Sequence, residues 1–549
     1  MRIFILLSFL LVCNILFAQN SYAPLGTIDY HIIDRLEIKN GRLSNAIFTS
    51  LKPYRRKDIV EMLNHIDTTL TWSKQDQFNI TFLNASNNLL SNSKDCISKK
   101  ALLKNVYRSK SAFYEVNKKD FSLKINPVLY LQGGKEKGVG EFKYINTRGI
   151  ELSGSIDNKI GFYTFLSDNQ AFHPTYINNK IATDEAVPGI GFYKSFHKTG
   201  FDYFNARGFI DFNITKHINI QLGQGNNFIG DGYRSLFLSA YANNYLFLKI
   251  NTKVWKFQYQ NLFTELTKQY NRGADTLLPK KYMTMHKLSY NATKWLNLGV
   301  FETVVFGRNN GFEFQYLNPI IFYRAIEQNL GSPDNAFIGL DFKANFLHHF
   351  SAYGQFLLDE FNLNQVKDST GWWGNKWATQ LGIKYIDIAG IKNLDGQLEL
   401  NIVRPYTYTH NKIISNYTHY NQPLAHPLGA NFKELIAILR YQPINRLNIL
   451  AKLIYNISGS DTGSSNVGSN IFLNNTSRDN DYYNTIGQGI GTKLFIADLT
   501  ISYHLKHNLF FDLRYRKRIF SDQMGINNLN TDYITFAMRL NIGQMNFDF

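Results

Sequence analysis

Apolar and polar side chains alternate with a period of two through most of the chain, from Asp120 onward. The first such stretch runs from Phe121 to Gln132, where one face is wholly apolar and the other is mostly polar. Successive side chains of a β-strand point to opposite faces, so a strand of this kind separates two different environments. The pattern predicts a protein built almost entirely from long strands with one apolar and one polar face.

Short turns interrupt the alternation at eight places: 157–159, 215–217, 251–253, 291–294, 347–349, 387–395, 442–446 and 506–508. Eight hairpins supply 16 strands, and the strand that opens at Phe121 together with a last one from Tyr533 to Ile542 makes 18. The nine remaining connections are mostly long and would all lie at the opposite end. Short turns at one end and long connections at the other are typical of outer-membrane barrels. We therefore predict an all-β transmembrane barrel of about 18 antiparallel strands over residues 119–549, located in the outer membrane of a Gram-negative cell.

The first 118 residues lack this alternation. Residues 1–18 combine a basic start, an apolar stretch and Ala18 before Gln19, which predicts a cleaved secretory signal. Residues 19–118 have a helical period instead, with a stripe that starts at Ile59 and Met62, and Ser73 as a helix cap. An even strand number puts both ends of the barrel on the side of its short turns, so we expect a small periplasmic helical domain.

Composition excludes several other classes of protein. Aromatic residues make up 15% of the 549 residues and charged residues only 18%, which disfavours a soluble helical protein and a tandem of soluble β-sandwiches. With two cysteines in the whole chain, a disulfide scaffold and a cysteine-based zinc site are excluded. The net charge of +17 favours anionic glycans or lipopolysaccharide as partners, although several of the lysines fall in the short turns.

The irregular motifs fall almost entirely in the long connections. We predict that the glycine-rich stretch 223–235 folds into the barrel mouth, and that residues 316–329 form a short helix that plugs the lumen. A connection rich in Tyr, Asn and His spans 404–431, and three tryptophans cluster before the twelfth strand. The candidate ligand-binding residues from these connections are Asp231, Arg234, Arg324, Glu327, Asn335, Trp372, Trp373, Tyr406, Tyr408 and His426.

Several of these motifs resemble the Wzi-type capsule assembly family. They are residues 52–54 (Lys-Pro-Tyr) with 56–60, the end of the glycine-rich stretch at 233–236, the Asn-Pro pair at 318–319, and residues 426–432. Within that family the chain looks most like the gliding-motility RemB-like members of Bacteroidetes. The resemblance spans the mature chain and implies an 18-stranded outer-membrane barrel with a periplasmic helical element. In the Wzi branch such a barrel helps to hold surface polysaccharide at the cell.

Catalysis, metal binding and cofactor binding find little support in the sequence. No Gly-x-Ser-x-Gly or comparable nucleophile motif occurs, so we predict no catalytic residue and no enzyme. His410, His419 and His426 are spaced nine and seven apart, which does not suit a transition-metal site, and acidic residues near Asp479 are better explained as a solvated loop than as a calcium site. The glycine-rich stretch lacks the strand-loop-helix context of a phosphate loop, and no Gly-Lys-Ser/Thr follows it, so no cofactor and no nucleic acid partner are expected.

Two functions stay open. A surface binder or assembly factor is favoured, because the connections offer aromatic faces and paired polar groups for sugars. Its expected partners are outer-membrane lipid and lipopolysaccharide, surface polysaccharide, and motility or secretion machinery proteins. A passive porin is the alternative, because 18 strands enclose a wide lumen. The tryptophans have a second explanation too, since aromatic girdles occur at membrane interfaces.

Overall fold

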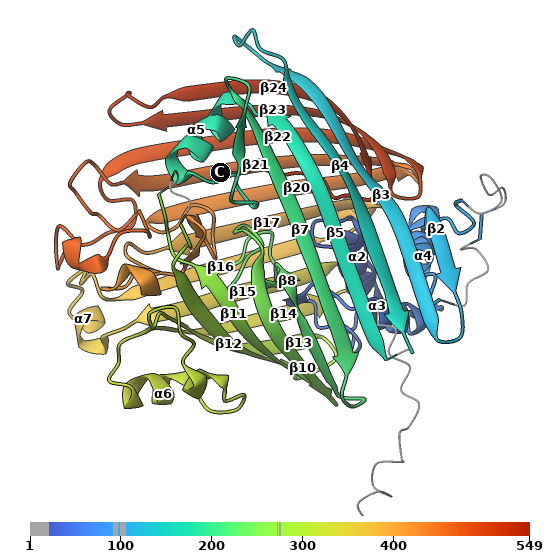
Figure 1. Ribbon diagram of the computed structural model, residues 1–549, viewed down its shortest axis with the longest axis horizontal. Coiled ribbons are helices and arrows are strands. Elements are labelled where there is room, and N and C mark those ends of the chain that lie inside the picture. Colours follow the sequence, from blue (N-terminus) through green and yellow to red (C-terminus); the bar gives the residue numbers. More distant parts are fainter. Residues whose placement is uncertain (1–20, 92–96, 99–105, 158, 272, 274–275) are drawn as a thin grey trace, which may run out of the picture.

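The computed structural model describes residues 21–91, 97–98, 106–157, 159–271, 273 and 276–549. Among these residues, eighteen long antiparallel strands close into one barrel, which confirms the predicted fold class and strand number (Figure 1). The predicted signal sequence lies outside the described residues. The barrel strands are β3 (Phe121–Glu136), β4 (Lys143–Ile156), β5 (Ile160–Phe172), β7 (Gly200–Asn213), β8 (Ile218–Gly225), β10 (Tyr245–Val254), β11 (Phe257–Thr267), β12 (Lys280–Asn291), β13 (Leu296–Phe306), β14 (Asn335–Phe346), β15 (Phe350–Glu360), β16 (Lys376–Tyr385), β17 (Leu394–Val403), β20 (Phe432–Ile444), β21 (Leu447–Ser460), β22 (Ile490–Lys506), β23 (Leu509–Asp522) and β24 (Leu529–Leu540).

The barrel closes where β24 pairs with β3, and each strand otherwise pairs with its neighbours along the chain. Short strands β2 (Tyr114–Asn117) and β6 (Lys194–Phe196) add to β3 and β7. We call the end of the barrel that carries the short hairpins the turn end, and the opposite end the loop end. Seven of the eight predicted turns fall at junctions between consecutive strands, and the last strand begins earlier than predicted, at Leu529.

The predicted turn at 251–253 is wrong. The hairpin between β10 and β11 turns at Trp255 and Lys256, where Val254 pairs with Phe257. Asn251 and Lys253 are polar because they lie on the inward face of β10, and the Lys253 ammonium donates to the Ala46 carbonyl oxygen at 3.0 Å. Asn251 and Lys253 thus resemble turn residues in sequence, although they lie within a strand and face the packed N-terminal domain.

The two faces of each strand meet different surroundings, as the alternation predicted. On β3, Ser122, Lys124 and Asn126 are buried inside the barrel, whereas Phe121 and Leu131 are exposed on its outer face. Exposed leucine and phenylalanine side chains recur on the outer face of the other strands. A continuous apolar band of this kind is the lipid-facing surface of an outer-membrane barrel.

Within the described residues, three helices precede the barrel: α2 (Asp29–Asn40), α3 (Arg56–Asn64) and α4 (Lys74–Ser86). They pack around Ile33, Leu36, Ile59 and Leu83, and Ser73 caps α4 in a capping box with Asp76, which confirms the predicted cap. The domain bounds 19–118 stay a prediction. No helix among the described residues is long and apolar enough to cross a membrane.

The helical domain sits inside the turn end of the barrel rather than beside it (Figure 1). From α2, Arg35 forms ion pairs with Asp387 (2.6 Å) and with Asp395, both supplied by the barrel, and with Asp76 of α4 (2.8 Å). Strand β1 (Leu51–Lys52) reaches further in and pairs with β9 (Phe228–Ile229), which belongs to the connection 226–244 from the loop end. The two ends of the barrel are therefore closed by segments that meet in the lumen.

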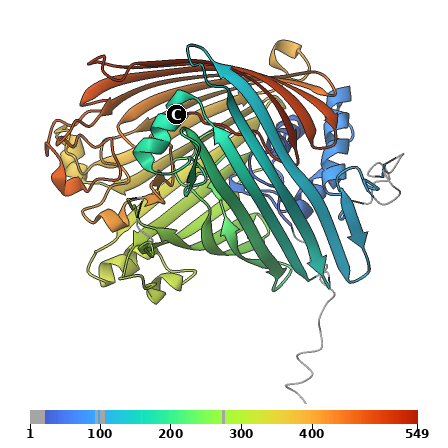
Figure 2. The same cartoon turned by 45° about the horizontal axis from the view of Figure 1, so that its top comes forward.

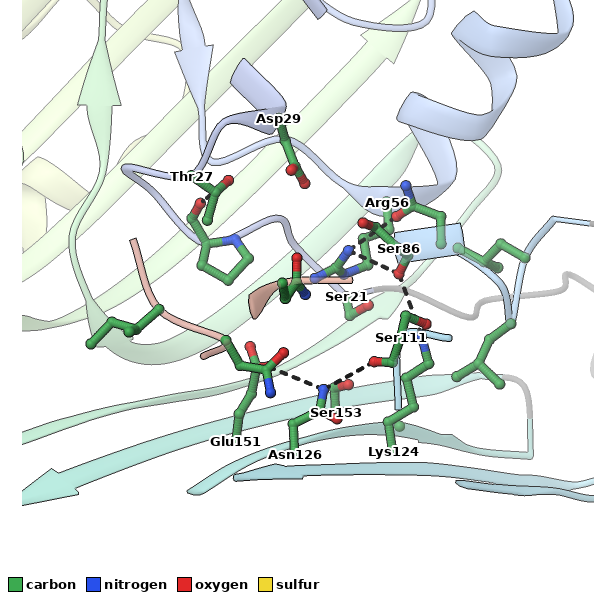
Figure 3. A pocket seen from close by; sticks show the side chains of 18 of the residues that line it. Ser21, Thr27, Asp29, Arg56, Ser86, Ser111, Lys124, Asn126, Glu151 and Ser153 are labelled. Carbon is green, nitrogen blue, oxygen red and sulfur yellow. Dashed lines mark hydrogen bonds between the residues drawn. The ribbon is translucent and has the colours of Figure 1, made fainter. Parts of the chain in front are cut away.

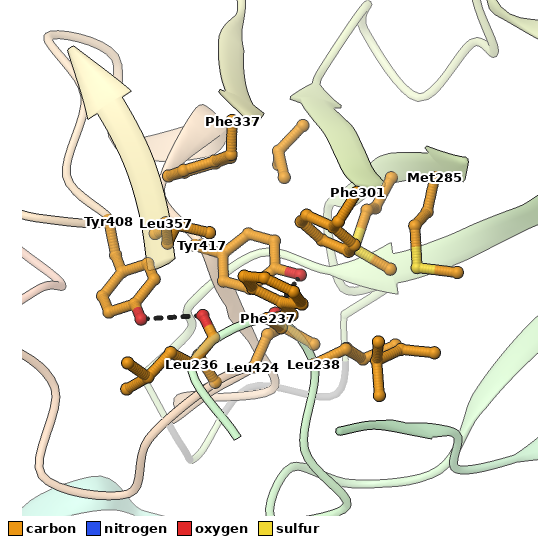
Figure 4. Packing of buried hydrophobic residues seen from close by; sticks show 14 of the residues in the cluster. Leu236, Phe237, Leu238, Met285, Phe301, Phe337, Leu357, Tyr408, Tyr417 and Leu424 are labelled. Carbon is orange, nitrogen blue, oxygen red and sulfur yellow. Dashed lines mark hydrogen bonds between the residues drawn. The ribbon is translucent and has the colours of Figure 1, made fainter. Parts of the chain in front are cut away.

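The connection 226–244 carries the main apolar core of the lumen (Figure 4). Leu236, Phe237 and Leu238 pack against the inward side chains of the wall, and the Phe237 ring stacks on Phe301 with 4.5 Å between ring centroids. Tyr417 and Leu424, from the connection 404–431, cover the same core. Helix α5 (Thr175–Asp184) and the C-terminal residues 541–549 also turn inward, and they pack together through Tyr176 and Phe549.

The prediction that residues 316–329 plug the lumen is wrong. This stretch contains the 3₁₀ helix η2 (Phe314–Leu317) and helix α6 (Tyr323–Asn329), and it folds down over the outer wall of the barrel. Figures 1 and 2 both show α6 outside the ring of strands. Tyr316 and Tyr323 pack on Val304 and Phe306, whose side chains point outward. We call residues 312–330 the outer-wall segment.

Candidate functional site

Two of the predicted site residues meet at a carboxylate in the middle of the lumen. Arg234 lies 3.0 Å from one oxygen of Glu434, and His426 Nε2 lies 2.7 Å from the other. The backbone N–H groups of Tyr233 and Arg234 donate to Glu399 at 2.6 and 2.9 Å. The wall strands β17 and β20 supply both carboxylates, so they hold the glycine-rich loop in place.

Four other predicted residues are buried and bonded within the chain. Asp231 accepts a hydrogen bond from Thr49 Oγ1 at 2.5 Å, and Asn335 donates to the Ser415 carbonyl oxygen at 3.0 Å. The hydroxyl groups of Tyr406 and Tyr408 donate to the carbonyl oxygens of Asn466 and Leu236 at 2.7 and 2.8 Å. These contacts give all four residues a structural role, and their role in ligand binding stays a prediction.

Arg324 and Glu327 do not join this network. They form an ion pair at 2.7 Å within α6, on the outer-wall segment. They therefore lie apart from Asp231 and Arg234, since the stretch that carries them does not enter the lumen. The reason is that the connection 307–334 leaves the rim outward, toward an outer face that its aromatic side chains cover.

The C-terminal residues form a lumenal contact that the sequence did not reveal. The Asp548 carboxylate contacts Lys452 and Tyr233, and Arg516 Nη2 donates to it at 2.5 Å. Arg234 Nη2 donates to the Asp548 carbonyl oxygen at 2.5 Å. The only signal in the sequence was that Lys452 and Arg516 occupy inward positions of their strands, where a charge needs a partner.

At the loop end, the connections 361–375 and 461–489 lie side by side. Their backbones are joined where Trp373 N–H donates to the Asp481 carbonyl oxygen at 2.9 Å and where Tyr483 N–H donates to Thr370 at 2.8 Å. Side chains from both connections gather there. We call this surface the rim patch and define it as Trp372, Trp373, Arg478, Asp481, Tyr482 and Tyr483.

The rim patch combines exposed aromatic rings with a paired charge. The Arg478 guanidinium lies 4.1 Å from the ring centroid of Trp373 and forms an ion pair with Asp481 at 2.5 Å. Tyr483 is 88% exposed, and Tyr482 is exposed too. Trp372 and Trp373 were predicted from their clustering, whereas Arg478, Tyr482 and Tyr483 were missed. The sequence feature that could have indicated them is the pair of adjacent tyrosines in a polar connection.

Histidines of the connection 404–431 are held neutral inside the lumen. His419 Nδ1 accepts a hydrogen bond from the Thr267 N–H at 2.9 Å, and burial lowers the pKa of His419 to about 3. Burial likewise lowers the pKa of His410 to about 4. Each of these histidines and His426 has separate partners. Within the described part of the chain, no group of three or more His, Cys, Asp or Glu side chains is placed to hold a metal ion.

Internal spaces remain between the helical domain and the wall, among them a larger and a smaller one. The larger, of about 420 Å³, lies between α2 and the base of the connection 226–244, and its charged lining includes the pair Asp34 and Lys384 at 2.6 Å. The smaller is a pocket of about 80 Å³, where Arg56 and Ser86 face Lys124 and Glu151 (Figure 3). Small-molecule sites usually measure about 300–1,000 Å³, so the smaller pocket suits a few water molecules only.

The chain is similar in sequence to one protein family and in fold to several solved barrels. Residues 206–522 match the family model for capsule assembly protein Wzi. Wzi of Escherichia coli, described as an outer-membrane protein involved in group 1 capsule assembly and a carbohydrate-binding β-barrel, is 15% identical. That match covers 96% of this chain and 100% of the other, with a TM-score of 0.60.

Two further matches are weaker. OprD of Pseudomonas aeruginosa is 10% identical over 76% of this chain and 94% of that one, with a TM-score of 0.42. OccAB2 of Acinetobacter baumannii is 10% identical over 76% of this chain and 97% of that one, with a TM-score of 0.43. No curated protein matches the chain significantly.

Proposed function

The chain belongs to the Wzi capsule assembly protein family, and from this premise we propose that it is a non-enzymatic barrel that binds surface polysaccharide at its rim patch. Its place is the outer membrane, in keeping with the closed barrel and its apolar outer face. The partners in this proposal are surface polysaccharide outside and lipopolysaccharide around the barrel. No cofactor is required.

The observation that carries the proposal is the exposure of aromatic rings beside charged groups at the loop end. Aromatic faces stack on the apolar faces of sugar rings, and arginine and carboxylate side chains bond to hydroxyl or acidic groups. Tyr482 and Tyr483 are exposed, and the backbone bond from Trp373 to Asp481 joins their connection to the tryptophans. The Arg478–Asp481 ion pair lies in the same patch. Carbohydrate binding by Wzi of Escherichia coli supports the same ligand class.

The filled lumen supports binding over conduction. An apolar core, a helical domain and several ion pairs occupy the space that a porin needs for water. A capsule assembly role at the surface requires no open channel. The passive porin alternative therefore has no specific observation in its favour.

Direct binding tests the proposal. The double variant Trp372→Ala with Tyr483→Ala should bind the capsular polysaccharide of the source cell about tenfold more weakly by calorimetry, since two stacking contacts contribute about 1–3 kcal/mol. Trp255→Ala is the matched control, because Trp255 is 68% exposed but lies in a hairpin at the turn end. Equal binding by the double variant and the wild type would contradict the proposal.

A role in gliding motility is the finer alternative that the resemblance to RemB-like proteins suggested. It would require protein partners at the surface instead of polysaccharide. A clean deletion strain separates the two roles when it is scored both for capsule retention and for surface spreading. Loss of cell-bound polysaccharide with normal spreading would favour capsule assembly, and the opposite result would favour motility.

A further inference from the structure

The outer face of strands β12 and β13 carries an ionisable pair, His286 and Glu302. Met285 and Phe301 point into the lumenal core, so their strand neighbours His286 and Glu302 point outward. His286 Nδ1 lies 2.7 Å from Glu302 Oε1, and both side chains are buried. A buried ionisable pair is unusual on this face, because exposed leucine, isoleucine and phenylalanine side chains recur on the outer wall.

The pair lies at membrane depth. Tyr290 stacks on Phe257 beside the exposed Trp255, and these rings mark the aromatic girdle of the turn end. His286 lies four positions before Tyr290 along β12, which corresponds to a height of about 10 Å on a tilted strand. Because the apolar band of such barrels is about 25 Å tall, the His286–Glu302 pair is within it. Ionisable groups that face lipid there are costly.

The outer-wall segment supplies a hydrogen-bond donor and an aromatic ring to this pair, which lipid acyl chains cannot do. The backbone N–H of Tyr323 donates to Glu302 Oε2 at 3.0 Å. The Tyr323 ring stacks on His286 with 3.9 Å between ring centroids. The pair is thus shielded from lipid by a segment of the same chain.

At the turning point of the outer-wall segment, residues 318–322, several polar backbone groups are hydrogen-bonded within the chain. The Pro319 carbonyl oxygen accepts from Tyr259 Oη at 2.8 Å and from Asn261 Nδ2 at 2.9 Å, and both donors lie on the outer face of β11. The Asn318 side chain accepts from the N–H groups of Ile320 and Ile321 at 3.1 and 3.2 Å. Irregular backbone is tolerated in hydrocarbon only when its polar groups are bonded within the protein.

The surface that the segment turns outward is apolar. Ile320 is 85% exposed and Phe314 is 76% exposed, with Leu317, Ile321 and Phe322 exposed between them. Val300 and Leu340, which pair on the adjoining strands β13 and β14, are exposed and apolar on the same outer wall. We propose that the outer-wall segment is a re-entrant element immersed in the membrane, whose apolar edge binds lipid acyl chains.

Spin labelling at its turning point tests this proposal. Ile320→Cys is introduced into a cysteine-free full-length chain, labelled with a nitroxide and reconstituted into phosphatidylcholine vesicles. Collisions are then measured with oxygen, which partitions into hydrocarbon, and with a water-soluble nickel chelate. Leu340→Cys provides the lipid-facing reference and Tyr483→Cys the aqueous reference. The label at position 320 should match that at position 340.

Two results would overturn the proposal. A label at position 320 that behaves like that at position 483 would place the segment in water. A label shielded from both reagents would show that a second copy or another protein covers it instead of lipid.

A charge substitution gives an independent readout. Ile320→Arg should lower the folding equilibrium constant in urea titrations by at least about tenfold, as expected for arginine within the apolar band, whereas Tyr483→Arg should change it by less than about threefold. Equal, small effects of both variants would contradict immersion in the membrane.

Discussion

Arg35 shows how one buried side chain joins the helical domain to the barrel. Its side chain is 3% exposed and contacts three carboxylates, those of Asp76, Asp387 and Asp395. Lys39 adds ion pairs with Asp76 at 2.7 Å and with Asp387 at 3.3 Å. Burial alone would raise the pKa of Asp76, but hydrogen bonds and charge from Arg35 lower it well below its usual range. The Arg35 guanidinium therefore stabilises the ionised form of the buried carboxylates around it.

We predict that Arg35→Ala destabilises the protein by about 3–5 kcal/mol, because it leaves buried carboxylates without their main partner. Urea unfolding followed by the gel mobility of unboiled samples measures this loss. Arg148→Ala is the control, since Arg148 pairs with Asp168 at 3.8 Å and both side chains are about half exposed. That control should cost less than about 1 kcal/mol. Similar losses in both variants would argue against the docking role of Arg35.

We also predict that His419 makes the stability depend on pH. Its pKa is about 3 in the folded chain because of burial, against about 6.5 in the unfolded chain, so only the unfolded chain takes up a proton between these values. The free energy of unfolding should therefore fall as the pH drops below 6.5. His419→Gln should reduce that fall between pH 6 and pH 4, as measured by urea unfolding at each pH. An unchanged pH dependence would contradict the assignment.

At the scale of elements, the orientation of the hairpins gives the next prediction. Residues 461–467 form an exposed turn at the loop end, and residues 215–217 join β7 to β8 at the turn end. An epitope inserted in 461–467 should be labelled by antibody on intact cells, because long connections of outer-membrane barrels face outside. The same epitope inserted in 215–217 should be labelled only after permeabilisation. The reverse labelling pattern would show that the orientation of the barrel in the membrane is opposite to the one predicted.

At the scale of the whole molecule, we predict that the two ends of the lumen are closed independently. The intact protein should show little or no conductance in planar bilayers, since the helical domain closes one end and the connection 226–244 the other. Replacing residues 227–243 by a short Gly-Ser linker should leave the helical domain in place. Stable channels should therefore appear only when Arg35→Ala is combined with that replacement.

The linker variant alone and Arg35→Ala alone are the matched controls for this measurement. Large unitary currents from the intact protein would contradict the closed lumen and would favour the porin alternative. Currents from either single variant that equal those of the combination would show that one end alone closes the barrel.

The barrel could be predicted from the amino-acid sequence alone, because the alternation of side chains along a strand is a local property. The polarity of Phe121 and Ser122 indicates which face of the strand is turned to lipid and which to the lumen. The number of turns then gives the number of strands. The alternation misled only where polar residues face a packed domain, as at Lys253. Trp372 and Trp373 could be placed on the rim from their position in a long connection.

The path of each long connection, in contrast, depends on contacts that form in the folded chain. A connection that enters the lumen, as at Arg234, and one that covers the outer wall, as at Tyr323, are both rich in polar and aromatic residues. The choice depends on partners far away in the chain, Glu434 for the first and Glu302 for the second. A connection packs against the part of the wall whose buried polar side chains need partners. These partners come together only when the barrel closes, so no local sequence pattern predicts the path of the connection.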